Sequence, residues 1–326
     1  MQAGVQNSMQ VATGSECVGE RARGCVLTIG NFDGVHLGHQ ALVSGVVDRA
    51  RKLGVHAAVY TFDPHPKRVL QPQHPHPQIT LWSQLEYELE RLGIGLLIRE
   101  PFTRELAALE PEDFVARLLH QRLGPAEIWV GRDFRFGHDR NGSDETLRRL
   151  AREHGMQVRV VSQVLEAGED VSSTRVRGLI ELGRIGEVAR CLGRLYTIWG
   201  SVVPGDGRGR TLGFPTANIT PENDLVPGIG VYATTIQRVE NDRPTGPLLP
   251  CVTNIGTRPT FGGSSTRVET HVLDFDGDLY GQRLALGFAA RLRGEQRFAG
   301  PDALRAQLVE DVKRARPLLV AQTAGS

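Results

Sequence analysis

The residues that most suggest chemistry are two histidines near the N-terminal end, in residues 30–39, GNFDGVHLGH. His36 and His39 are three positions apart at the start of an amphipathic segment, so they share one face of a predicted helix. A helix N-terminus offers free N–H groups and positive potential, which suit a phosphate, and the glycines let a ligand approach the backbone. Two imidazoles there could stabilise the negative charge that builds on a phosphate during a transfer reaction.

Two other interpretations of this stretch stay open at this point. The histidines could hold a metal ion together with Asp33 or His65, since zinc is often bound by histidines and a carboxylate. The stretch could also be a purely structural turn.

Two further stretches favour the phosphate hypothesis. Residues 171–177, VSSTRVR, place three hydroxyls and two arginines at a predicted helix start, which is more than an N-cap needs. Residues 131–137, GRDFRFG, follow a predicted strand and mix aromatic with charged side chains. Such a segment could hold a flat ring beside a phosphate.

A second group of candidate residues lies in 205–218, GDGRGRTLGFPTAN. Backbone N–H groups of a glycine-rich loop can line a polyphosphate, although no Walker A sequence occurs. Thr216 and Asn218 point to the same side of an extended segment, and their oxygen atoms suit Mg²⁺. The alternative is a hairpin turn flanked by two hydrogen-bonding side chains. Phosphoryl transfer to an alcohol also needs a base, for which Glu269 is the candidate, while we expect His271 to be structural.

Alternating apolar and amphipathic segments must position the first group. Strands are predicted over residues 25–29, 55–62, 94–98, 126–130 and 156–161. The predicted helices cover residues 81–92, 111–123 and 145–154, and a first helix carries Leu42, Val46, Ala50 and Leu53 on one face before Gly54. This alternation is typical of a doubly wound parallel α/β sheet, which binds ligands at the carboxyl ends of its strands. We expect residues 1–24 to be a flexible extension and residues 25–190 to form this domain.

The second half of the chain has a different pattern. Short β-rich segments at 197–203, 230–237, 252–255, 269–275 and 283–290 are separated by glycine- and proline-rich turns. They predict a closed antiparallel β-barrel over residues 191–326. One helix is predicted to start near Pro301 and to end before Pro317.

The composition excludes several classes of protein. Lysine plus arginine is 38 and aspartate plus glutamate is 37, so no basic surplus favours nucleic-acid binding. The 4 cysteines show no CxxC spacing, as expected for free thiols in a reducing cytoplasm. No apolar run approaches the ~20 residues that cross a bilayer, and no signal peptide is visible. We expect a cytoplasmic protein that is a monomer or a weak homo-oligomer.

The motifs of the first half, in their order, resemble a known family. GNFDGVHLGH, residues 61–66 (TFDPHP), GRDFRFG and SSTRVR are similar to the Rossmann-like adenylyltransferase domain of bacterial bifunctional riboflavin kinase/FAD synthetases. The resemblance implies transfer of AMP from ATP to FMN, giving FAD and pyrophosphate, with His36 and His39 on the ATP phosphates. The binding residues that it implies are Gly30, Asn31, Phe32, Asp33, Gly34, Phe62, His65, Gly131, Asp133, Phe134, Phe136, Gly137, Ser173, Thr174, Arg175 and Arg177.

The second half resembles the riboflavin kinase barrel of the same family. The similarity lies in GRGRTLGFPTAN, residues 230–233 (GVYA), 254–261 (NIGTRPTF), 268–281 (VETHVLDFDGDLYG) and 292–298 (LRGEQRF). It implies that Thr216 and Asn218 bind Mg²⁺–ATP and that Glu269 activates the ribityl 5′-hydroxyl of riboflavin. Further binding residues implied are Gly205, Gly207, Gly209, Arg210, Thr211, Asn254 and Arg293.

The resemblance therefore predicts an enzyme that converts riboflavin to FMN and then FMN to FAD. Its small-molecule partners are riboflavin, FMN and ATP, and FMN and FAD are substrate and product rather than redox cofactors. Three alternatives remain. The first domain could have lost adenylylation, or could use another acceptor such as pantetheine phosphate or nicotinate mononucleotide, which fits the histidines but not the barrel. The chain could also be a flavin-binding regulator without turnover.

Overall fold

A computed structural model describes residues 9–205, 209, 212–260 and 263–323. The chain folds into two compact units, one of Met1–His76 with Gln84–Val171 and one of Pro77–Ser83 with Ser172–Ser326. The second unit begins before the predicted domain boundary near residue 190, because the helices after Ser172 pack with the strands that follow them. The boundary between the two activities stays a prediction.

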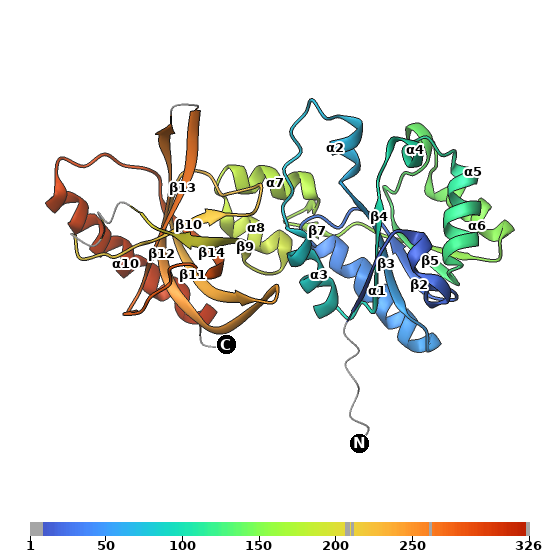
Figure 1. Cartoon of the computed structure of the whole chain (residues 1–326), viewed down its shortest axis with the longest axis horizontal. Coiled ribbons are helices and arrows are strands. Elements are labelled where there is room, and N and C mark those ends of the chain that lie inside the picture. The colour runs from blue at the N-terminus through green and yellow to red at the C-terminus, as the bar shows by residue number, and fades with distance from the viewer. Residues whose placement is uncertain (1–8, 206–208, 210–211, 261–262, 324–326) are drawn as a thin grey trace, which may run out of the picture. The chain divides into compact units, whose positions relative to one another are not determined.

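The first unit is built on a parallel sheet (Figure 1). Between residues 9 and 171 the chain forms β1 (Gln10–Thr13), η1 (Ser15–Cys17), η2 (Gly19–Ala22), β2 (Val26–Ile29), α1 (Leu37–Leu53), β3 (Ala57–Asp63), α2 (Pro66–Leu70), α3 (Trp82–Arg91), β4 (Leu96–Pro101), α4 (Arg104–Ala107), α5 (Pro111–Asp113), η3 (Phe114–Leu123), β5 (Glu127–Gly131), η4 (His138–Arg140), α6 (Asp144–Glu153), β6 (Gln157–Val161) and the β7–β8 hairpin (Leu165–Glu166, Glu169–Asp170). The strand order is β1-β4-β3-β2-β5-β6. The chain runs outward from β2 to β4, then returns to the other side of β2 with β5. This reversal is the point at which such sheets bind ligands, and it confirms the predicted fold class.

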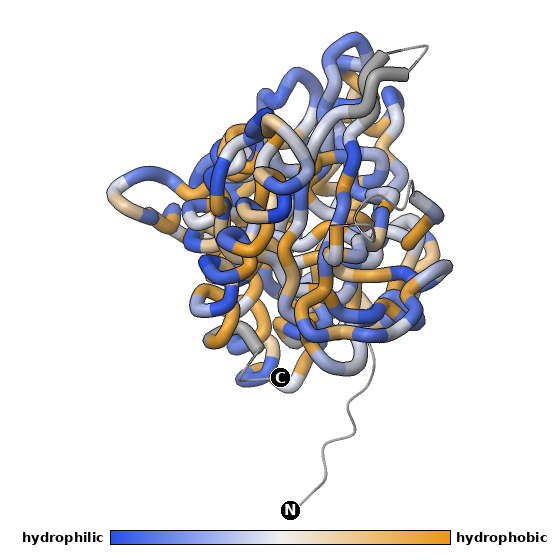
Figure 2. The backbone as a smooth tube through the Cα atoms, turned by 90° about the vertical axis from the view of Figure 1, so that its left-hand side faces the viewer, coloured by the Kyte–Doolittle hydropathy of each residue, from blue (hydrophilic) through white to orange (hydrophobic). Residues whose placement is uncertain are grey.

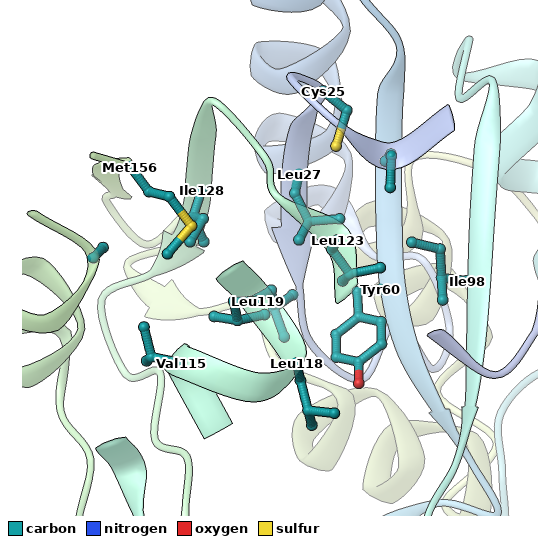
Figure 3. Packing of buried hydrophobic residues seen from close by; sticks show 14 of the residues in the cluster. Cys25, Leu27, Tyr60, Ile98, Val115, Leu118, Leu119, Leu123, Ile128 and Met156 are labelled. Atoms are coloured by element: carbon teal, nitrogen blue, oxygen red, sulfur yellow. The ribbon is translucent and has the colours of Figure 1, made fainter. Parts of the chain in front are cut away.

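Alternate residues of the strands build two apolar layers, one on each face of the sheet. Leu27, Tyr60, Ile98 and Ile128 point to the face that η3 covers (Figure 3). Residues of the other parity, such as Val26 and Val59, are equally buried. On that face α1 packs on β2, β3 and β5. Strands buried on both faces explain the near-continuous apolar runs in the sequence.

The expectation of a flexible extension over residues 1–24 is wrong for residues 9–24. β1 pairs in parallel with β4 at the edge of the sheet. Directly after it, the Ser15 N–H donates to the buried Glu100 carboxylate at 2.6 Å, and Arg122 donates to the Ser15 hydroxyl at 3.1 Å. Edge pairing and one buried charge-assisted hydrogen bond hold a segment whose polar composition predicts no strand.

Two helices of this unit differ in detail from prediction. The helix expected over residues 111–123 is present, but from Phe114 to Leu123 it is a π-helix. In α1 the buried residues are Leu42, Val43, Val46 and Ala50, whereas Leu53 is 42% exposed because it lies in the last turn, next to the left-handed C-cap Gly54.

The second unit is a closed antiparallel barrel, as predicted. From residue 172 the chain forms α7 (Ser173–Glu181), α8 (Ile185–Leu192), β9 (Tyr196–Val203), β10 (Ala217–Pro221), β11 (Gly230–Glu240), β12 (Arg243–Thr260), β13 (Gly263–Val272), β14 (Arg283–Arg293) and α10 (Pro301–Thr323). The strand order around the barrel is β10-β13-β12-β11-β14-β9. Closure removes the exposed edges that an open sheet would leave.

The sequence predicts that the C-terminal helix ends before Pro317. This prediction is wrong, because the helix continues to Thr323. A proline inside a helix removes one hydrogen bond and crowds the preceding turn. Here Ala315 and Leu319, on either side of Pro317, are buried in a cluster with Val231, Val252 and Leu292 of the barrel. We infer that this apolar packing holds the last turns in place.

Hydrophobic and hydrophilic residues alternate along the coloured part of the backbone in both units (Figure 2). Within the described residues, no helix is both long and apolar enough to cross a membrane.

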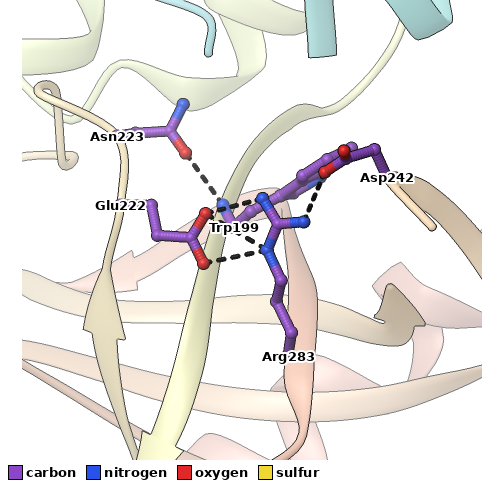
Figure 4. A network of polar contacts seen from close by, with 5 residues as sticks. All are labelled: Trp199, Glu222, Asn223, Asp242 and Arg283. Atoms are coloured by element: carbon purple, nitrogen blue, oxygen red, sulfur yellow. Dashed lines mark hydrogen bonds and ion pairs between the residues drawn. The ribbon is translucent and has the colours of Figure 1, made fainter. Parts of the chain in front are cut away.

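A polar network joins four segments of the barrel around Arg283 at the start of β14 (Figure 4). Its guanidinium donates to both oxygens of Glu222 at 2.7–3.1 Å and to Asp242 at 2.5 Å, and it lies 5.0 Å from the Trp199 ring. The side-chain oxygen of Asn223 accepts a hydrogen bond from the backbone N–H of Trp199 at 2.8 Å. A planar guanidinium that is bound bidentately and stacked on a ring is not replaceable by lysine.

We predict that Arg283→Met lowers the free energy of unfolding by about 1–2 kcal/mol, because the two carboxylates lose a bidentate partner and the indole loses its cation. Thermal unfolding followed by circular dichroism measures this change. Arg316→Met is the matched control. Arg316 pairs with Asp274, whose side chain is 70% exposed, and exposed ion pairs contribute little to stability, so this variant should lose less than Arg283→Met. Equal losses in both variants would contradict a special role for the Arg283 network.

Candidate active sites

The first candidate site begins where β2 ends and the backbone turns into α1. His36 is the N-cap of α1, and its Nδ1 accepts a hydrogen bond from the backbone N–H of His39 at 3.4 Å. Phe32 and Asp33 are buried in the turn, and Gly34 has a φ of 88°, which favours glycine. The sequence therefore folds this turn to place both histidines at a helix N-terminus.

The two imidazoles stack on each other, with ring centroids 3.6 Å apart and planes inclined by 21°. Burial, followed by the repulsion that a protonated His36 would exert, lowers the pKa of His39 well below its usual value. Within the described residues, His39 Nδ1 is buried without a hydrogen-bond partner. His39 is therefore neutral at pH 7 and able to donate a hydrogen bond.

A cavity of about 770 Å³ opens at the carboxyl ends of the strands of this unit. The predicted residues that line it are Gly30, Asn31, Phe62, Asp133, Phe134, Phe136 and Gly137. They come from three segments that follow β2, end β3 and follow β5. The cavity thus joins residues that are up to 107 positions apart (30 to 137), and it lies where the order of the strands reverses.

The cavity wall combines aromatic rings with cations. Phe134 and Phe136 stack with centroids 5.6 Å apart, and Phe62 meets Phe102 edge to face at 5.6 Å. The cationic lining residues are Arg135, which belongs to the GRDFRFG segment, and Lys67, Arg104 and Arg140, which sequence reasoning missed. A flat ring and a phosphate both find suitable partners in this wall. The signal for these cations along the chain is their place in the segments that follow predicted strands.

His65 does not line this cavity, although the two residues that follow it, Pro66 and Lys67, do. It is buried, and its Nδ1 accepts a hydrogen bond from the Lys67 N–H at 3.2 Å, which caps α2. Its ring lies 4.2 Å from that of His76. Gly131, the last residue of β5, precedes the cavity-lining segment. Across the described ranges, no cluster of three or more His, Cys, Asp or Glu side chains is placed to bind a metal ion.

The hydroxyl- and arginine-rich motif belongs to the second unit. Ser172 is the N-cap of α7 and accepts a hydrogen bond from the Arg175 N–H at 3.3 Å. Capping therefore uses one hydroxyl, while Ser173 and Thr174 lie in the first turn. Arg177 donates to the Pro77 carbonyl at 2.9 Å. The predicted contacts of Ser173, Thr174, Arg175 and Arg177 with ATP stay predictions.

In the barrel, strand register brings three predicted residues into one row. Glu269 of β13 is paired with Asn218 of β10 on one side and with Asn254 of β12 on the other. Residues directly opposite each other in antiparallel strands have neighbouring side chains. The candidate base therefore lies next to a candidate magnesium ligand, although they are 51 positions apart in the chain (218 to 269).

The backbone at two glycines passes close to the side chains of the candidate magnesium ligands, Thr216 and Asn218. A Cβ at Gly205 would lie 1.9 Å from the Asn218 amide nitrogen, and a Cβ at Gly209 would lie 3.1 Å from the Thr216 hydroxyl. A Cβ at Gly209 would also lie 2.3 Å from the Phe214 carbonyl oxygen, so this close backbone approach favours glycine at position 209. Thr216 also lines a cavity of about 320 Å³ with Ala217, Thr270 and the 275–280 segment. The predicted binding residues Gly207, Arg210 and Thr211 lie outside the described residues.

Two further side chains hold the base and the Thr216 segment. Arg267, which sequence reasoning missed, forms an ion pair with Glu269 at 2.9 Å and approaches the Asn218 side-chain oxygen at 3.5 Å. His271 Nδ1 lies 2.8 Å from the Pro215 carbonyl oxygen, next to Thr216. His271 therefore has a structural contact, as expected.

Arg293 lies at the end of β14 and is bound by the C-terminal helix. Its guanidinium makes a bidentate pair with the fully buried Asp311, with distances of 2.8–3.1 Å. This pair fastens α10 to the barrel. The predicted proximity of Arg293 to the flavin stays a prediction.

A nucleotidyltransferase-like sheet unit followed by a kinase-like barrel defines a two-domain transferase that acts on nucleotides. Family models agree with this division: FAD synthetase matches residues 19–175 and riboflavin kinase matches residues 192–319. The chain belongs to the family of bifunctional riboflavin kinase/FMN adenylyltransferases. It is therefore a transferase that phosphorylates riboflavin and adenylylates FMN.

Individual relatives support this assignment. The chain is 38% identical to the bifunctional riboflavin kinase/FMN adenylyltransferase of Escherichia coli strain K12 over 90% of this chain and 92% of the relative. The corresponding protein of Pseudomonas fluorescens is 38% identical over 95% and 98%. A crystal structure from Streptococcus pneumoniae, described as a macrolide-efflux protein, has a TM-score of 0.86 and 29% identity, covering 95% of this chain and 99% of that one.

The lowered pKa of His39 leads to a prediction for ligand binding. In the free enzyme His39 should titrate below its usual midpoint of about 6.5, and a bound triphosphate should raise this midpoint because it favours the charged imidazole. Titration of the histidine signals by NMR, with and without a non-hydrolysable ATP analogue, measures both values.

The same shift has a consequence for stability. Unfolded His39 binds a proton more readily than folded His39. Its contribution to the free energy of unfolding is therefore fully present above pH ~6.5 and is lost as the pH falls from there through the folded pKa. A His39 midpoint at or above the usual value in the free enzyme would contradict its burial beside His36.

Proposed function

We propose that the two reactions use separate sites, with Glu269 as the base of riboflavin phosphorylation and His36 and His39 as the groups that stabilise adenylyl transfer. The observation that carries the proposal is the register that sets Glu269 between Asn218 and Asn254. A carboxylate beside oxygen ligands is the arrangement that phosphoryl transfer to an alcohol needs.

In the barrel, Glu269 takes the proton of the ribityl 5′-hydroxyl while the oxygen attacks the γ-phosphorus of ATP. The bond between the γ-phosphorus and the bridging oxygen breaks, which releases ADP and leaves FMN. Thr216 and Asn218 are the residues that would hold Mg²⁺, and the pairing of Asn218 with Glu269 and the place of Thr216 in the cavity wall support this role. When bound, Mg²⁺ supplies positive charge for the β- and γ-phosphates. Arg267 keeps the carboxylate of Glu269 oriented.

In the sheet unit, a phosphate oxygen of FMN attacks the α-phosphorus of ATP. The bond to the β-phosphate oxygen breaks, so that pyrophosphate leaves and FAD forms. His36 and His39 donate hydrogen bonds as charge develops on the α-phosphate, and no covalent intermediate is needed. The aromatic wall of the large cavity holds the flavin ring, and its cations hold the FMN phosphate.

The proposal extends to the setting in which the enzyme works. Cys25, Cys191 and Cys251 are buried free thiols, and burial raises the pKa of Cys25 to about 12. Together with exposed Cys17, which is also free, they fit a reducing cytoplasm. The balanced net charge provides no basic surplus for binding nucleic acid. That the enzyme is a monomer or a weak homo-oligomer stays a prediction.

Reciprocal variants test the division of roles. Glu269→Gln should lower FMN formation from riboflavin by about 100-fold or more, because the base is lost, and should leave FMN-to-FAD conversion unchanged. His36→Gln with His39→Gln should lower FAD formation from supplied FMN by about 100-fold or more and leave riboflavin phosphorylation unchanged. Chromatographic separation of the flavins after incubation with ATP and Mg²⁺ measures both rates.

Glu310→Gln and His120→Gln serve as controls, because these side chains lie on α10 and η3, outside both proposed sites. Loss of both activities in either test variant would argue against two independent sites. If Glu269→Gln forms FMN at the full rate, Glu269 is not the base of riboflavin phosphorylation. A wild-type enzyme that binds FMN without converting it to FAD would favour a kinase with a degenerate first domain.

A further inference from the structure

The turn before α1 contains a residue in an unfavourable conformation. Val35 has a φ of 41°, in the left-handed region that a β-branched residue rarely adopts. Its side chain is fully buried, so the conformation is built into the packing of the turn. Such strained positions persist only where surrounding contacts hold them, and they cluster at functional sites.

The side chain of Gln40 is one of the contacts that hold this turn. Its Nε2 donates to the Val35 carbonyl at 2.8 Å, while the Val35 N–H donates to the Phe32 carbonyl at 3.0 Å. The backbone N–H of Gln40 also donates to the His36 carbonyl at 2.9 Å. Gln40 therefore binds the strained residue with its side chain and the neighbouring histidine with its backbone.

The orientation of His36 follows from this turn. His36 uses Nδ1 as an acceptor for the His39 N–H, so the neutral ring carries its proton on Nε2. The ring is further held by its stack on His39. The turn thereby sets both the direction and the tautomer of His36, whose neutral ring carries its N–H on Nε2.

We propose that Gln40 is a positioning residue for adenylyl transfer, which fixes the left-handed Val35 turn so that His36 presents an Nε2–H donor. This inference rests on the proposed role of His36 and His39. Gln40 acts through the turn and through His36, and it needs no contact with ATP or FMN.

Gln40→Met tests the inference, because methionine keeps the length of the side chain and removes the donor. The kcat of FAD formation from FMN should fall by about tenfold, with KM for ATP and FMN changed by less than about twofold, since the lost contact serves the transition state. Riboflavin phosphorylation by the same chain should stay unchanged and reports that the protein is folded. Imidazole ¹⁵N shifts should show that His36 no longer holds a single Nε2–H tautomer.

Val35→Gly provides the rescue, because glycine adopts the left-handed conformation without strain. In the Val35→Gly background, Gln40→Met should lower kcat by less than about threefold. The matched control is Gln121→Met, an exposed position on η3, which should change neither activity.

The outcomes separate this inference from the proposed function. Full kcat and an unchanged His36 tautomer in Gln40→Met overturn the positioning role, even if the histidine variants are inactive. The positioning role is also overturned if Gln40→Met lowers kcat equally in the wild-type and in the Val35→Gly background. The strain at position 35 would then play no part in the effect. Histidine variants that retain FAD formation overturn the proposed function itself.

Discussion

Hydrogen-bonded strand register is the constraint on which both candidate sites depend. In the parallel sheet, carboxyl ends of β2, β3 and β5 lie at one edge, which gathers distant segments around a single cavity. In the barrel, antiparallel pairing sets Asn218, Glu269 and Asn254 side by side. A shift of one residue in β13 would turn Glu269 to the opposite face of its strand. The chemistry of each unit therefore depends on backbone pairing before it depends on any side-chain contact.

Buried polar contacts hold two helices on these paired strands. Glu127 of β5 is buried and binds Arg49 of α1 at 2.5 Å, and its other oxygen accepts from the Trp129 indole at 3.1 Å. The same indole fills the space beside Gly45, where a Cβ would come within 2.6 Å of the ring. These contacts seat α1 on the sheet, and α1 carries both histidines at its first turn. In the barrel, the pair of Arg293 with buried Asp311 seats α10 in a similar way.

Much of this architecture could be predicted from the sequence, because periodicity reports burial. The apolar runs of β2 to β6 and the turn signals of the barrel were sufficient for the fold class. The residue types of GRDFRFG pointed to Phe134, and the family resemblance pointed to Phe62. The order of the strands, the edge strand β1 and the continuation of α10 through Pro317 depend on contacts between distant segments. Lys67, Arg104, Arg267 and Gln40 were missed for the same reason. A cation or an amide becomes functional through what folding places beside it, which spacing along the chain does not reveal.

The central claim is that each scaffold acts on a different phosphorus atom of ATP, the barrel on the γ-phosphorus and the sheet unit on the α-phosphorus. Incubation with riboflavin and ATP labelled at either position, followed by separation of the flavins, tests this most directly. The account predicts that the γ-label enters FMN and is carried into FAD, whereas the α-label appears in FAD alone. An α-label in FMN, or FAD made from riboflavin without the γ-label, would contradict it.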